Sequence, residues 1–73
     1  MNVIIKYIKF QHMYGRVVAM GQLQKFDPDS QNGEVLLQGS VAQMLQMVEA
    51  QKMVIVNSQE VLDILVRKGG FGA

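Results

Sequence analysis

The hydrophobic residues of this 73-residue chain change their spacing along its length, and each change marks an expected element. Residues 3 to 10 are rich in β-branched and aromatic side chains, although their alternation is imperfect, and this composition predicts a strand. Residues 16 to 26 place their side chains alternately on two faces, which predicts a second strand. Residues 34 to 38 predict a short third strand. The apolar run from 53 to 56 is too short for a helix and predicts a strand buried on both faces.

Two segments instead repeat their apolar residues every three to four positions. This spacing predicts helices over residues 41 to 51 and from about 58 to 68. A polar residue precedes each segment, with Gln or Glu three positions further on, so we predict capping boxes at Ser40 and Asn57. Gly69 ends the second helix, because glycine favours helix C-termini.

Two features predict local backbone irregularity. Residues 27 to 33 combine Asp, Pro, Ser, Asn and Gly, which indicates a tight loop between strands. The loop is not a calcium site, because an EF-hand counted from Asp27 lacks its required glycine and glutamate. Gly21, inside the second expected strand, indicates a bulge or a close backbone approach.

The element order β-β-β-α-β-α predicts an α+β fold with a three- to four-stranded, mainly antiparallel sheet and two helices on one face. We expect residues 1 to 68 to form a single domain and residues 69 to 73 a flexible, glycine-rich tail. The last strand could be reached by a crossover within the sheet or could pair antiparallel at an edge. A chain this short buries a small core and has no cysteine, so we expect homo-oligomerisation to add stability.

Charge is unevenly distributed, although the formal net charge is only +1. The first 26 residues hold four cations and no carboxylate, whereas residues 27 to 49 hold four carboxylates and no cation. No apolar run approaches the length of a membrane span, and the N-terminal residues do not resemble a signal peptide. We therefore expect a cytoplasmic protein that does not associate with a membrane.

Groups able to carry catalysis are few. The only histidine, His12, is expected in a turn, and the three serines fall in a loop and at helix starts, so no catalytic triad is indicated. One imidazole and scattered carboxylates do not form a zinc site, and no glycine pattern fits a phosphate loop. We expect a non-enzymatic protein that holds neither a cofactor nor a metal.

The N-terminal segment interleaves cations with aromatic rings, a composition that binds phosphates and stacks bases. The candidate nucleic-acid contacts are Lys6, Tyr7, Lys9, His12, Tyr14 and Arg16. A solvated strand face would have a similar composition, and the net charge is low for a nucleic-acid-binding protein. Moreover, a regular strand would point Lys6 and Lys9 to opposite faces, and only a bulge between them would bring them together.

The opposite orientation of Lys6 and Lys9 in a regular strand disfavours a nucleic-acid surface. It therefore favours a protein that acts through protein–protein contacts, in an accessory, assembly or inhibitory role. Its expected anchors are Met44 and Met47, which widen the apolar stripe of the first helix, and Phe71 in the tail. Core filling and a frayed terminus are the competing interpretations of these residues. The sequence thus predicts a macromolecule-binding protein, with a protein partner ahead of nucleic acid.

Overall fold

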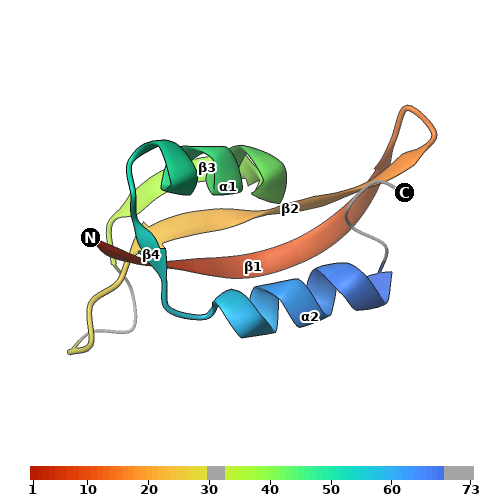
Figure 1. Cartoon of the computed structure of the whole chain (residues 1–73). Helices are drawn as coiled ribbons and strands as arrows, with labels where there is room; N and C mark the ends of the chain where they lie inside the picture. The colour runs from red at the N-terminus through yellow and green to blue at the C-terminus, as the bar shows by residue number, and fades with distance from the viewer. Residues whose placement is uncertain (30–32, 69–73) are drawn as a thin grey trace.

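A computed structural model describes residues 1 to 29 and 33 to 68 of the chain. Its elements are β1 (Asn2–Met13), β2 (Arg16–Lys25), β3 (Val35–Ser40), α1 (Val41–Ala50), β4 (Val54–Ile55) and α2 (Ser58–Lys68). The strands form one mixed sheet in the order β3-β2-β1-β4, flanked by the two helices (Figure 1). The predicted α+β class and element order are confirmed. The expected tail, including Phe71, lies outside the described residues.

The sheet combines antiparallel and parallel pairing. β1 pairs antiparallel with β2, and β2 pairs antiparallel with β3, whereas β4 runs parallel to β1 at the opposite edge. β3 and β4 therefore run in the same direction, and α1 connects them across the two central strands. Of the two connections that the sequence allowed, the chain uses the crossover.

β1 and β2 form a long hairpin that extends beyond both helices (Figure 1). Tyr14 and Gly15 form its two-residue turn, with φ of 54° and 76°, as a type I′ turn requires. β1 continues three residues past its predicted end because pairing with β2 extends to Met13. His12 accordingly lies in a strand and not in the expected turn.

A β-bulge interrupts β1. The pairing register with β2 shifts between Lys6 and Lys9, so that Tyr7 and Ile8 together oppose Gly21. Tyr7 adopts a positive φ of 58°. A Cβ atom at Gly21 would lie 3.2 Å from the carbonyl oxygen of Lys6, so glycine permits the close approach. The irregularity predicted at Gly21 is confirmed, and the extra residue belongs to the neighbouring strand.

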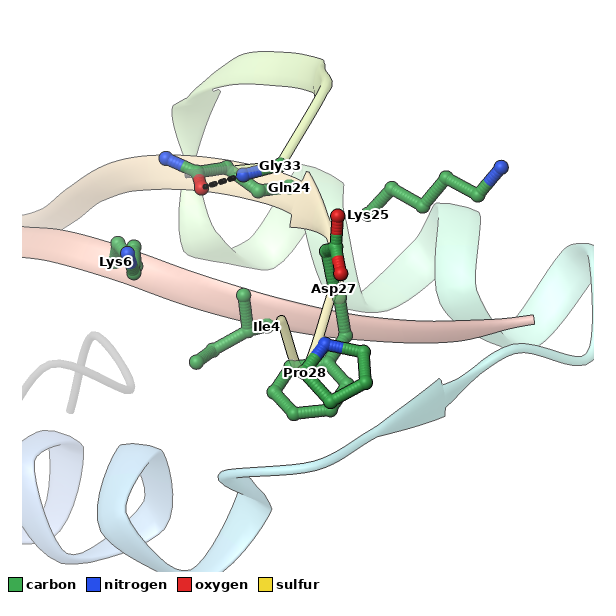
Figure 2. Close-up of a pocket in the computed structure, with 8 residues that line it drawn as sticks. Ile4, Lys6, Gln24, Lys25, Asp27, Pro28 and Gly33 are labelled. Atoms are coloured by element: carbon green, nitrogen blue, oxygen red, sulfur yellow. Dashed lines mark hydrogen bonds between the residues drawn. The ribbon is translucent and has the colours of Figure 1, made fainter. Parts of the chain in front are cut away.

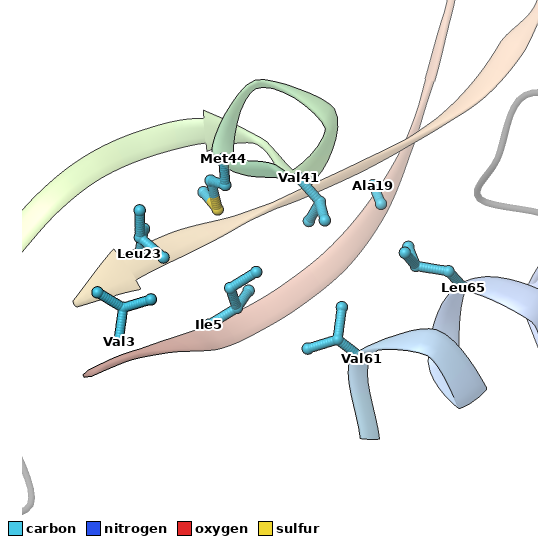
Figure 3. Packing of buried hydrophobic residues seen from close by; sticks show 8 residues of the cluster. All are labelled: Val3, Ile5, Ala19, Leu23, Val41, Met44, Val61 and Leu65. Atoms are coloured by element: carbon cyan, nitrogen blue, oxygen red, sulfur yellow. The ribbon is translucent and has the colours of Figure 1, made fainter. Parts of the chain in front are cut away.

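The hydrophobic core lies between the helices and one face of the sheet. Side chains from β1, β2, α1 and α2 converge there (Figure 3). Its buried members are Val3, Ile5, Ala19, Leu23, Val41, Met44, Val61 and Leu65. Since both helices contribute to one cluster with the same sheet face, they cover that face together, as predicted.

The two predicted capping boxes have different outcomes. At Ser40, which also ends β3, the side chain accepts from the backbone N–H of Gln43, and the Gln43 side chain accepts from the Ser40 N–H. At Asn57 the prediction is wrong. The Asn57 amide instead bonds Ile5 of β1, accepting from its N–H at 3.2 Å and donating to its carbonyl at 2.9 Å. Asn57 thus continues the edge pairing of β1 beyond β4.

β4 differs from the strand that its apolar run predicts. It spans two residues, and Val54 is 58% exposed because β4 lies at the edge of the sheet. The prediction of a strand buried on both faces is therefore wrong. The loop after β2 starts with the Asp29 N–H donating to the Asp27 carboxylate, as its turn residues predict.

Candidate nucleic-acid interface

The face of the sheet opposite the helices is the open face. Residues directly opposite in a ladder share a face, so the pairing register assigns the side chains of the strands. Leu23 and Ala19 of β2 point into the core, and the alternate residues of β2 therefore point to the open face. The open face includes Ile4, Lys6, Lys9, Gln11, Arg16, Val18, Met20, Gln22, Gln24 and Gln38.

The bulge determines where the cations of β1 lie. Lys6 is opposite Gln22 and Lys9 is opposite Met20, which are two residues apart on β2. Lys6 and Lys9 therefore share the open face, and Arg16 lies on the same face further along β2. The sequence allowed this shared face only if a bulge separated the two lysines, and β1 has that bulge.

The strands of the open face carry positive charge without negative charge. Neither residues 2 to 25 nor residues 35 to 40 contain Asp or Glu. Carboxylates lie at the borders, with Asp27 just after β2 and Glu60 of α2 beside the edge of β1. Lys9 and Arg16 are exposed, so both can contact a ligand in solution.

A hollow of about 380 Å³ opens on this face at the bulge. Its lining includes Tyr7, Lys9, Gln11, Met20, Gln22 and Gln38. Tyr7 is 65% exposed, and the ammonium group of Lys6 lies 6.0 Å from the centre of its ring. We name this hollow the Tyr7 hollow. It combines an aromatic ring, a cation and amide groups that both donate and accept hydrogen bonds.

A second hollow of about 290 Å³ lies at the other end of the open face, between Ile4, Gln24 and the start of the loop after β2 (Figure 2). Gln24 is buried, and its Oε1 accepts a hydrogen bond from the Gly33 N–H at 3.3 Å. Its Nε2 donates to Oε1 of Gln22. Gln24 thus fixes the position of the Gln22 amide oxygen. Asp27 also lines this second hollow, which is less suited to phosphate for that reason.

The remaining nucleic-acid candidates lie near the end of the hairpin. His12 is opposite Val17, so it lies on the other face from Arg16. Tyr14 is exposed in the turn. The structure therefore brings Lys6, Lys9 and Arg16 to one face, with Tyr7 beside them, and leaves His12 and Tyr14 apart.

Of the three anchors expected for a protein partner, Met44 and Met47 lie on α1, and Phe71 lies outside the described residues. Met44 is 0% exposed in the core, so the core-filling interpretation applies to it and it does not serve as a surface contact. Met47 is half-buried and packs against the same core. Sequence reasoning also missed the glutamines of the open face. The alternation of Gln22 and Gln24 with buried Leu23 was the signal that could have identified them.

Comparison with known proteins found no matching family model, curated protein or solved structure. Within residues 1 to 29 and 33 to 68, no group of three or more metal-ligating side chains lies close enough to hold an ion. No helix in that part of the chain is long and apolar enough to cross a bilayer.

Proposed function

We propose that this protein binds single-stranded nucleic acid on the open face of its sheet. The observation that carries the proposal is the bulge at Tyr7, which puts Lys6 and Lys9 on the face that also holds Arg16. Sheet surfaces that bind single strands combine cations that contact phosphates with aromatic rings that stack bases. The open face has both kinds of group, and its strands lack the carboxylates that would repel a phosphate backbone.

The cations suit an extended ligand. Along β2, the partner positions of Lys6 and Lys9 and the position of Arg16 span about 20 Å at the usual rise per residue. A strand of nucleic acid that follows the hairpin can therefore contact all three side chains in succession. This arrangement predicts binding that depends on the backbone and is strongly weakened by salt.

The Tyr7 hollow supplies the contacts to a base. The exposed ring of Tyr7 offers a stacking surface, a contact worth about 1–3 kcal/mol per base. The amides of Gln22 and Gln38 lie opposite each other on β2 and β3 and can bond the edge of the base. Because Gln24 holds the Gln22 amide in place, this group needs little ordering on binding.

Charge reversal tests the proposal. The double variant Lys9→Glu/Arg16→Glu removes two exposed cations from the open face. The control Lys52→Glu/Lys68→Glu makes the same change in net charge at exposed positions outside the sheet. In fluorescence anisotropy with labelled single-stranded RNA and DNA at low salt, we expect wild-type binding that weakens at least tenfold in the first variant and less than threefold in the control.

The salt dependence provides a second measurement. Each phosphate contact contributes a slope of about −0.7 to log K against log salt for single strands, so three contacts predict about −2. We expect the open-face variant to lose more than half of this slope. Absence of wild-type binding, or equal weakening in both variants, would show that the open face is an ordinary solvated surface.

A further inference from the structure

α2 presents a second surface, on the side away from the sheet. Val61 and Leu65 of α2 are buried in the core, whereas Leu62 is 46% exposed and Val66 is 69% exposed. Residues four apart are neighbours on a helix, so Leu62 and Val66 form one apolar strip. Because the open face lies on the other side of the sheet, this strip is separate from the proposed nucleic-acid surface.

The charges on α2 specify what fits against this strip. Glu60 lies in the first turn, Asp63 lies in the middle, and Arg67 and Lys68 lie in the last turn. A second α2 packed parallel would place equivalent turns at the same level, so the acidic residues of one copy would not lie beside the basic residues of the other. A second α2 packed antiparallel brings Asp63 of each copy near Arg67 of the other, because the charge order is reversed.

The apolar strip of Leu62 and Val66 also fits an antiparallel pairing. An antiparallel pairing about a two-fold axis midway between Leu62 and Val66 places Leu62 of one copy against Val66 of the other, twice. Such an interface is self-complementary, as a closed dimer requires. We infer that this protein forms a homodimer through antiparallel packing of α2 against α2 of a second copy.

The size of the chain supports a dimer. A 73-residue domain without disulfides has a small core, and covering the outer side of α2 enlarges the apolar surface that is removed from water. The inference does not depend on the proposed function. Both open faces of the dimer stay accessible, since the contact lies on the helical side of each sheet.

Sedimentation equilibrium between about 5 and 500 µM tests the dimer. We expect the wild-type mass to rise with concentration from 8.2 kDa toward twice that value. The variant Leu62→Glu/Val66→Glu should remain at the monomer mass, with unchanged circular dichroism. The control Val54→Glu changes an exposed apolar residue of β4 and should dimerise like the wild type.

A charge swap tests the orientation. Asp63→Arg and Arg67→Asp each place like charges across the antiparallel contact, and each should weaken the dimer at least threefold. The double variant Asp63→Arg/Arg67→Asp restores opposite charges in both copies and should recover dimerisation. A wild-type protein that stays monomeric at every concentration would overturn the inference, as would a double variant that is weaker than both single variants.

Discussion

The two faces of the sheet are built from the same strands, but one is packed against the helices and the other is exposed to solvent. On the helical side, Leu23 and Ile5 are buried and close-packed. On the open face, Lys9 and Gln38 are exposed, and no helix restricts their size or charge. Packing on the buried face fixes the register of the hairpin, and that register determines which side chains lie on the open face.

The bulge at Tyr7 illustrates this dependence. Val3 and Ile5 point into the core at odd positions, whereas Ile8 and Phe10 pack against the core at even positions. One extra residue between the two pairs satisfies both, because it reverses the alternation without moving either pair. The same extra residue brings Lys9 to the face of Lys6. The shared position of the cations is therefore a consequence of core packing.

Truncation on the buried face should have the largest effect. Leu23→Ala removes a fully buried side chain and should lower the free energy of unfolding by about 2–5 kcal/mol. Gln38→Ala on the open face is the matched control and should change it by less than about 0.5 kcal/mol. Urea denaturation followed by circular dichroism measures both. Similar losses in the two variants would mean that the open face is buried in solution.

The edge of the sheet should give an intermediate effect. Asn57→Ala leaves the N–H and carbonyl of Ile5 without their side-chain partner, and we expect a loss of about 1–3 kcal/mol. Ser40→Ala removes only a helix cap, with an expected loss of about 1 kcal/mol. Thermal and urea denaturation rank the two variants. If Asn57→Ala cost less than Ser40→Ala, the Asn57 bonds to β1 would not stabilise the fold.

Deletion of Tyr7 should have only a small effect on stability. Without this residue, positions 3 to 10 alternate regularly, and Ile8, Lys9 and Phe10 keep their present faces. Relief of the positive φ of Tyr7 offsets the local rearrangement, so we expect a change within about 1 kcal/mol. Affinity for single strands should nevertheless fall severalfold, because the stacking ring is lost. A deletion variant that fails to fold would show that the bulge is needed for more than register.

By itself, the sequence determined the structural features that depend on interactions between neighbouring residues. The alternation of β2, the helix after Ser40 with its capping box and the element order all follow from side-chain periodicity and local hydrogen bonding. The irregularity at Gly21 was also predictable, because glycine in a strand marks a close backbone approach. Local chemistry is sufficient at these positions, since each partner lies within a few residues or on the adjacent strand.

Only the tertiary structure decided the features that depend on distant partners. Asn57 bonds a residue 52 positions away instead of capping its own helix, because the exposed edge of β1 lies beside it. Met44 became a core residue because α1 packs its stripe onto the sheet, and β4 became an edge strand because the crossover ends there. Lys6 and Lys9 share a face because one pair of apolar residues at odd positions and another pair at even positions must both enter the core. Periodicity within a segment does not contain this information, since it arises from packing between segments.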